Sequence, residues 1–167
     1  EMPTAVIFYD LIPLLYPEKF LAWEPMKRWY MRKLEYLKRA DLLLCISESA
    51  AREAKIYLGK EAPPLRVVSS AVSERFRPAA VRSCVLERFG IEGAYIMLAS
   101  AYEKRKNFEG LIEAYALLPR ELIERYSLVL LSRIPLEKLG RLQRRIGELR
   151  LSERVIFTGY VSDGEML

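Results

Sequence analysis

The amino-acid sequence predicts an α/β protein built from parallel β-sheets with crossover helices. Short continuous apolar runs, typical of strands in a parallel sheet, recur along the chain. Amphipathic stretches with helical spacing lie between these runs. The alternation is interrupted once, near residue 75, where periodicity is lost and a proline follows. We therefore expect parts of two domains rather than one continuous sheet.

The first half of the chain is expected to contain three strands. Its apolar runs lie at residues 5–9, 42–46 and 65–69, and the first has the pattern of a strand buried on both faces. Residues 11–17 carry two prolines, which predicts a loop with an apolar surface rather than a helix. Helices are expected at residues 25–39 and 48–57, the second with Ser47 or Ser49 as its N-cap.

The predicted helix at residues 25–39 is amphipathic and basic. Its apolar residues recur at helical spacing, while lysines and arginines occupy the other faces. Two interpretations remain open. The helix packs on the sheet with a solvated basic face, or that face binds an acidic membrane surface or another anionic partner.

The second half repeats the same alternation after a predicted linker at residues 72–78. We assign residues 1–71 to one domain and residues 79–167 to a second. Helices of the second domain are expected at about 80–89, 107–118 and 136–149, with Pro119 ending or kinking the middle one. Strands are expected at 95–99, 128–131 and 155–158.

The segment 99–107 is the candidate ligand site. Three cations, Lys104, Arg105 and Lys106, follow an apolar strand and precede an amphipathic helix. Amides at a helix N-terminus lack intrahelical partners, and the helix dipole adds partial positive charge there. Full positive charges at such a place favour an anion such as phosphate. The alternative is a solvated basic turn without a ligand.

Composition narrows the chemistry. The chain has no histidine, the commonest general base and metal ligand, and its two cysteines have no zinc or disulfide spacing, so we expect free thiols and no metal. The net charge of +5 is spread over both halves, so we expect no nucleic-acid partner. No apolar run reaches the roughly 18 residues that span a bilayer, and residues 1–4 are not a signal peptide. We expect a cytoplasmic location, with peripheral contact at the inner membrane face through helix 25–39 as an alternative.

Six sequence blocks in order resemble the retaining family 4 glycosyltransferases, and the likeness covers nearly the whole chain. The blocks are residues 9–14 (YDLIPL), 40–49 (ADLLLCISES), 72–78 (VSERFRP), 105–107 (RKN), 114–119 (AYALLP) and 157–161 (FTGYV). The likeness is to bacterial enzymes that build O-antigen, capsule and other polysaccharides, many of them mannosyltransferases.

This resemblance implies the GT-B fold, in which two Rossmann-like domains face a cleft. Residues 1–71 then correspond to the late part of the N-terminal acceptor-side domain. Residues 79–167 correspond to the early part of the C-terminal nucleotide-sugar domain. Complete enzymes of the family are much longer, so we expect a fragment that is inactive alone.

The activity that the resemblance implies is hexosyl transfer with retention, mannose being the sugar that it suggests. The donor would be a GDP- or UDP-linked sugar and the acceptor a glycan or a lipid-linked glycan, without a cofactor or a metal. Lys106 matches the family lysine that holds the donor diphosphate, and Arg105 is its basic neighbour. Gly159 and Tyr160 align with a loop whose backbone reaches the nucleotide base.

The chain departs from the family pattern at two places. Ser100 and Ala101 stand where the family has two glycines beside the donor diphosphate, and Tyr9 stands where many relatives have histidine. Asp10, which follows Tyr9, either caps the next loop or contacts acceptor or sugar hydroxyls, and is a candidate catalytic residue on the second interpretation. The missing glycines motivate an alternative function, a degenerate, non-catalytic glycosyltransferase-like scaffold that binds a partner.

Overall fold

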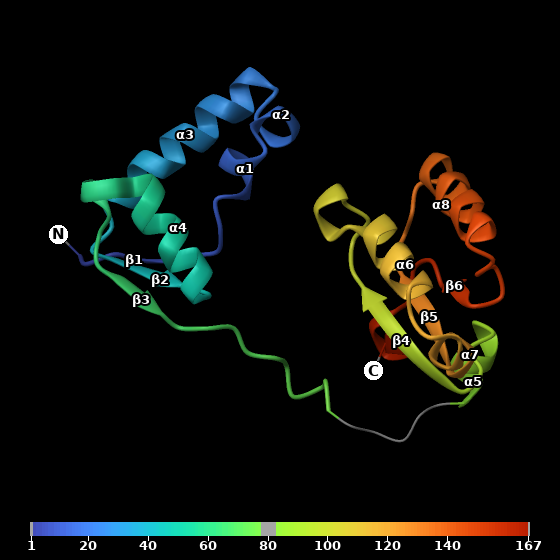
Figure 1. The fold of residues 1–167 in the computed structure, drawn as a ribbon. Coiled ribbons are helices and arrows are strands. Elements are labelled where there is room, and N and C mark those ends of the chain that lie inside the picture. Colours follow the sequence, from blue (N-terminus) through green and yellow to red (C-terminus); the bar gives the residue numbers. More distant parts are fainter. Residues whose placement is uncertain (1, 78–82, 167) are drawn as a thin grey trace. The chain divides into compact units, whose positions relative to one another are not determined.

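The computed structural model describes residues 2–77 and 83–166. They form two compact units that divide between Ser73 and Glu74 (Figure 1). This division falls inside the predicted linker 72–78, whose last residue lies outside the described part. Each unit holds one three-stranded parallel sheet with helices packed against it. The prediction of Rossmann-like parallel sheets with crossover helices is confirmed.

The first unit is built on the sheet β1-β2-β3, in which all strands are parallel. Its elements in chain order are β1 (Ala5–Phe8), α1 (Ile12–Leu15), α2 (Pro17–Phe20), α3 (Glu24–Lys38), β2 (Leu42–Cys45), α4 (Glu48–Leu58), the 3-10 turn η1 (Gly59–Glu61) and β3 (Leu65–Val67). Phe8 pairs with Cys45, and Cys45 with Val67, so the three strands end at the same edge.

The core of the first unit lies between β2 and the helices α3 and α4. Leu43 and Cys45 of β2 are fully buried, and Leu34 of α3 packs in the same cluster. Helix α4 contributes small buried residues such as Ala54, which let it approach the sheet closely. Its start is capped by Ser47, whose Oγ accepts a hydrogen bond from the Ala50 amide at 3.1 Å, as one of the two predicted caps requires.

Two single-turn helices occupy the segment predicted as a loop. Helix α1 has Pro13 in its first turn, and helix α2 begins at Pro17. A proline is tolerated there because the missing N–H would have no intrahelical acceptor in any case. The loop prediction for residues 11–17 is therefore wrong, since both prolines start a helix instead of preventing one.

The second unit is built on the parallel sheet β4-β5-β6. Its elements are α5 (Ser83–Arg88), β4 (Ala94–Ala99), the 3-10 turn η2 (Lys104–Lys106), α6 (Phe108–Ala116), α7 (Arg120–Arg125), β5 (Tyr126–Leu131), α8 (Leu136–Glu148), β6 (Val155–Phe157) and α9 (Asp163–Met166). The helix predicted from residue 80 is seen from Ser83 onward, and its first residues lie outside the described ranges.

Helices α6 and α8 pack side by side against the sheet of the second unit (Figure 1). Leu128 and Leu130 of β5 are fully buried against Ile112 of α6 and Leu142 of α8. Pro119 ends the predicted middle helix, as expected, and also stands at the N-cap of α7, a helix that the sequence did not predict.

The two edge strands are more exposed than their apolar sequences suggest. Ile7 of β1 is 58% exposed and Met97 of β4 is 48% exposed. Within the described residues, β1 pairs only with β2, and β4 only with β5. The expectation that the first apolar run is buried on both faces is therefore wrong: Val6 and Phe8 face the core, whereas Ala5 and Ile7 on the opposite face are exposed.

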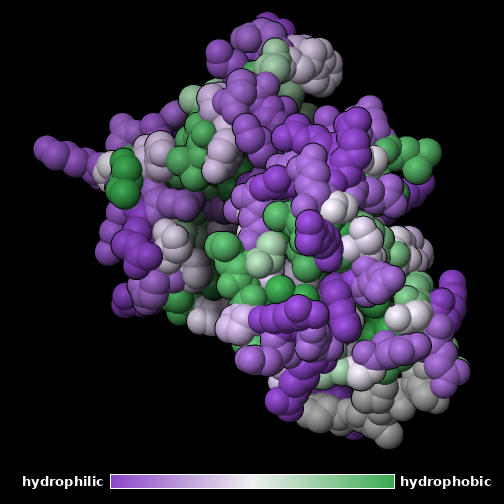
Figure 2. All heavy atoms as spheres, turned by 45° about the vertical axis from the view of Figure 1, so that its right-hand side comes forward, coloured by the Kyte–Doolittle hydropathy of each residue, from purple (hydrophilic) through white to green (hydrophobic). Residues whose placement is uncertain are grey.

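The surface combines many polar side chains with scattered apolar ones. On the face shown in Figure 2, hydrophilic residues dominate and hydrophobic residues form smaller patches between them. Among the helices of the described ranges, none is long and apolar enough to cross a bilayer.

Candidate functional site

Loops from three neighbouring strands leave the second sheet at its carboxyl edge. Ala99 pairs with Leu131, and Leu130 with Phe157, so the parallel strands end nearly level. The Ser100 amide donates to the Leu131 carbonyl at 3.3 Å. The Thr158 amide likewise donates to the Leu130 carbonyl at 3.2 Å. The predicted site residues Ser100, Arg105, Lys106, Gly159 and Tyr160 thus all lie on loops at one edge, where open α/β sheets bind ligands.

The cationic turn has a defined backbone. The Lys106 amide donates to the Glu103 carbonyl at 2.9 Å, and the Asn107 amide donates to the Lys104 carbonyl at 3.1 Å. These bonds form the 3-10 turn η2 directly before α6. Lys104, Arg105 and Lys106 are all exposed, so the turn presents its cations to solvent.

The two predicted diphosphate-binding cations have different surroundings. The Arg105 Nε lies 2.8 Å from Glu103 Oε2, and both side chains are about one third exposed. Within the described part of the chain, no carboxylate pairs with the Lys106 ammonium. Lys106 can therefore bind an anion directly, whereas Arg105 must break its ion pair with Glu103 or bind the anion alongside it.

Asn107 fixes the start of α6. Its backbone is left-handed, with φ 50° and ψ 50°, and its Oδ1 accepts from the Gly110 amide at 3.2 Å. A Cβ added to Gly110 would lie 2.3 Å from Asn107 Nδ2, so a larger residue at position 110 would force the capping side chain to shift. One of the helix-start amides that could face an anion is thus already satisfied by the protein.

Replacing Asn107 with alanine is expected to destabilise the second unit by about 2 kcal/mol. Alanine loses the cap, worth about 1 kcal/mol, and must adopt a left-handed backbone that costs about as much again. Asn107→Gly is the matched control, because glycine accepts this backbone and costs only a few tenths of a kcal/mol as an N-cap. Urea unfolding of both variants measures the difference, and equal midpoints would show that the cap does not hold the turn.

An aromatic pair anchors the turn to the core. The rings of Tyr102 and Phe108 lie 5.0 Å apart at 56°, and Phe108 is 2% exposed. Burial raises the pKa of Tyr102, with the nearby Glu109 charge adding to the effect, so this phenol stays neutral at physiological pH. The contact between Tyr102 and the buried ring of Phe108 therefore fixes the cationic turn to the core of the second unit.

Ser132 is a residue of this edge that the sequence reasoning missed. It directly follows β5, the central strand, and is 5% exposed. Its Oγ is buried and makes no hydrogen bond to any described residue. Leaving a buried hydroxyl unpaired costs free energy. A polar residue directly after an apolar strand was the signal that could have found it.

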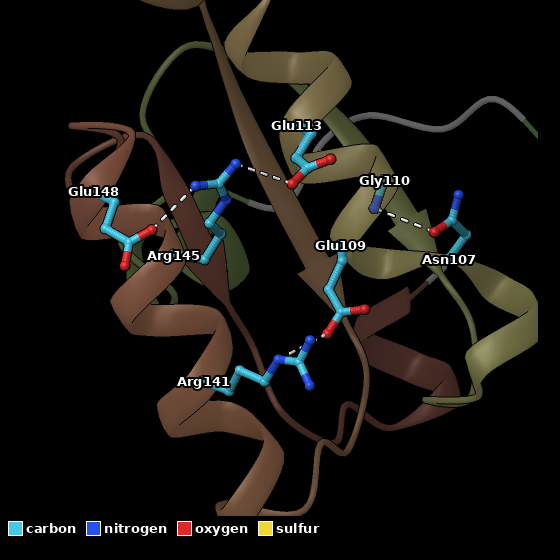
Figure 3. Close-up of polar contacts among 7 residues, drawn as sticks. All are labelled: Asn107, Glu109, Gly110, Glu113, Arg141, Arg145 and Glu148. Carbon is cyan, nitrogen blue, oxygen red and sulfur yellow. Dashed lines mark hydrogen bonds and ion pairs between the residues drawn. The ribbon is translucent and has the colours of Figure 1, made fainter.

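A hollow of about 730 Å³ lies between α6 and α8; Asn107 at the end of the cationic turn lines it, but Arg105 and Lys106 do not. Figure 3 shows its ion pairs. Arg145 contacts Glu113 at 3.1 Å and Glu148 at 3.1 Å, and Arg141 lies 3.5 Å from Glu109. With Arg144, three arginines face three glutamates, so the hollow has no excess positive charge for a phosphate. The pairs with Glu109 and Glu113 join α8 to α6, whereas the pair with Glu148 lies within α8; each of these exposed pairs contributes at most about 1 kcal/mol.

Asp10 lies in the first unit, two residues after the end of β1. Its Oδ1 accepts from the Ile12 amide at 2.9 Å, so it caps the turn into α1, one of the two roles considered for it. Glu53 Oε2 accepts from the Leu11 amide at 3.2 Å. Burial, followed by the charges of Asp10 and Glu53, raises the pKa of Tyr30 to about 12. A neutral phenol and two carboxylates thus gather at the carboxyl end of β1.

Comparisons with known proteins agree with this architecture. Residues 88–167 match the family model of glycosyl transferases group 1. The chain is 36% identical over 169 residues to the serotype-specific mannosyltransferase WbdA of Escherichia coli, an alignment that covers 98% of this chain and 21% of the relative. It is 31% identical over 129 residues to the O-antigen chain mannosyltransferase B of Escherichia coli, which covers 74% of this chain and 33% of that relative.

These matches cover only part of each relative. The chain spans about a fifth of the length of the WbdA relatives. The likeness first seen in six sequence blocks is confirmed by these matches. Residues 88–167 are therefore similar to the glycosyl transferases group 1 family, and the chain as a whole is similar to part of the mannosyltransferases of Escherichia coli.

Proposed function

We propose that this chain is part of a retaining hexosyltransferase that moves mannose from a GDP- or UDP-linked sugar to a glycan or lipid-linked acceptor. The proposal includes a cytoplasmic location. It assigns residues 1–71 to the acceptor side and residues 79–167 to the donor side. The observation that carries it is Lys106, a cation without a carboxylate partner among the described residues, on the turn between β4 and α6 of a unit similar to the group 1 family.

Lys106 would act on the leaving group. When the bond between the sugar and the diphosphate breaks, negative charge grows on the diphosphate oxygens. A fixed ammonium beside those oxygens stabilises the transition state more than the ground state, and this difference is what raises turnover. The departing diphosphate would itself take the acceptor proton on the same face of the sugar, so no histidine base is needed.

Arg105 would play a secondary part. Its guanidinium can bind two phosphate oxygens at once, but Glu103 already holds its Nε at 2.8 Å. Replacing the Glu103 carboxylate by a phosphate at Arg105 gains less binding free energy than bringing a phosphate to Lys106, which has no carboxylate partner among the described residues. We therefore propose Lys106 as the principal diphosphate ligand and Arg105 as its neighbour. Gly159 and Tyr160, at the end of β6, are proposed to reach the nucleotide base.

The loop at Ser100 favours a second candidate function, a scaffold that no longer binds a donor. Ser100 Oγ donates to the Ala101 carbonyl at 3.3 Å, and both residues carry side chains where the family has glycines. Side chains there limit how closely backbone amides approach a phosphate. A degenerate domain that binds a partner protein would tolerate this loss.

Calorimetry with GDP and with UDP distinguishes the two functions. The full-length protein that contains this chain is expected to bind one of them, and Lys106→Ala is expected to weaken that binding much more than Lys104→Ala. Lys104 is the matched control because it lies on the same exposed turn. Absence of heat with both nucleotides would favour the scaffold, and equal losses in the two variants would contradict the role of Lys106.

A further inference from the structure

Large apolar side chains form a solvent-exposed cluster at the start of α3. Every residue from position 22 to 29 is exposed. Trp23 is 67% exposed, Met26 41% and Trp29 51%, and Tyr36 further along the helix is 54% exposed. Scattered exposed apolar residues need no explanation, but a cluster containing two indoles marks a binding surface.

Several of these side chains lie on the side of α3 opposite its buried residue, although Trp29 and Tyr36 also line a hollow of about 520 Å³ beside β1. Leu34 is 7% exposed and anchors α3 in the core of the first unit. At 3.6 residues per turn, Trp29, Arg32 and Tyr36 lie about half a turn away from Leu34 around the helix. The outward side of α3 therefore interleaves aromatic rings with a cation.

The same side of the helix carries uncompensated positive charge. Arg28 and Arg32 are exposed and have no acidic partner among the described residues. Lys33 Nζ lies 5.6 Å from the Trp29 ring and 5.9 Å from the Tyr36 ring, so it stands between two aromatic faces. Lys38 differs, because it pairs with Glu35 at 3.0 Å and with Glu61 at 2.7 Å.

A small apolar hollow completes the surface. It measures about 310 Å³ and is lined by Trp23, Pro25, Met26 and Trp29. Two indoles thus border a space that accepts hydrocarbon, with arginines close by on the same helix.

We propose that this aromatic–basic face of α3, made of Trp23, Met26, Arg28, Trp29, Arg32 and Tyr36, binds the surface of an anionic lipid bilayer. Indole and phenol rings favour the headgroup region of a membrane. Lysine and arginine add attraction to anionic headgroups, and their long stems reach the phosphates while the rings insert. The apolar hollow favours acyl chains over a nucleic acid. The proposal does not depend on sugar transfer, and its test reads lipid binding alone.

Tryptophan fluorescence reports on this face directly. The chain has two tryptophans, and both, Trp23 and Trp29, belong to it. Phosphatidylglycerol vesicles are expected to shift the emission of the chain to the blue, and brominated acyl chains in those vesicles are expected to quench it. Phosphatidylcholine vesicles are expected to do neither, and high salt is expected to weaken the effect.

A pair of charge-reversal variants separates the face from the net charge. Arg28→Glu with Arg32→Glu is expected to lower partitioning into phosphatidylglycerol vesicles on the order of 25-fold or more, since each cation near a membrane surface contributes roughly fivefold. Arg52→Glu with Lys55→Glu, on exposed positions of α4, changes the net charge equally and is expected to have a much smaller effect. Circular dichroism checks that both variants keep the helices.

Several results would overturn the proposal. Emission that stays unchanged with phosphatidylglycerol vesicles excludes lipid contact at the two tryptophans. If both double variants lose vesicle partitioning equally, the binding depends on the net charge of the chain and not on this face of α3. A blue shift that grows with protein concentration without lipid would assign the face to a second copy of the chain. A stronger shift with single-stranded RNA than with vesicles would assign it to nucleic acid.

Discussion

Lys106→Ala is expected to lower the turnover of the full transferase at least 100-fold. Removing a fixed donor from the charge that develops in a transition state costs about 3 kcal/mol, which corresponds to roughly two orders of magnitude in rate. The effect is expected in kcat as well as in kcat/KM, because the charge on the diphosphate grows as the sugar leaves. Initial rates at saturating nucleotide-sugar measure it.

Two neighbouring substitutions make this experiment specific. Lys104→Ala removes an equal charge from the same turn and is expected to change the rate only a few-fold. Arg105→Ala is expected to fall between the two, because Glu103 already holds the guanidinium. A Lys106→Ala enzyme with the wild-type rate would refute the proposed role of this turn.

Leu130→Ala is expected to destabilise the second unit by about 3 kcal/mol while leaving the first unit unchanged. Leu130 is fully buried between the sheet and the helices α6 and α8, so truncation leaves a cavity as well as losing buried surface. Leu43→Ala is the converse control, since Leu43 is equally buried in the core of the first unit.

Hydrogen exchange resolves this effect along the chain. Leu130→Ala is expected to speed amide exchange in the strands β4, β5 and β6, and Leu43→Ala in β1, β2 and β3. If either variant speeds exchange equally in both sheets, the two units unfold together, and the assignment of two domains at residues 1–71 and 79–167 loses its support.

Most elements of the fold follow from local sequence pattern. Apolar runs mark β2 and β5 because a parallel strand between two neighbours needs apolar side chains on both faces. The pattern fails where one residue type has two structural uses. Pro13 was expected to prevent a helix but lies in the first turn of α1, whereas Pro119 follows the end of the middle helix as expected and also stands at the N-cap of α7.

In the candidate site, too, some features could be predicted from the sequence and others could not. The position of Lys106 on a strand-to-helix turn could be predicted, since it depends on neighbouring residues in the sequence. The pairing of Arg105 with Glu103 depends on side-chain conformation in the turn, which no periodicity encodes. The burial of the Ser132 hydroxyl without a hydrogen-bond partner depends on tertiary packing around the end of β5. Such features require the tertiary structure.

The contact between Asn107 and Gly110 makes the two positions mutationally dependent. A glycine inside a helix is usually a place where alanine gains about 0.5–1 kcal/mol of stability. Here the added methyl group would displace the Asn107 side chain from its amide and so lose the cap that holds the cationic turn. Helix stabilisation at position 110 would therefore loosen the turn beside the proposed donor site, and engineering of this segment has to change both residues together.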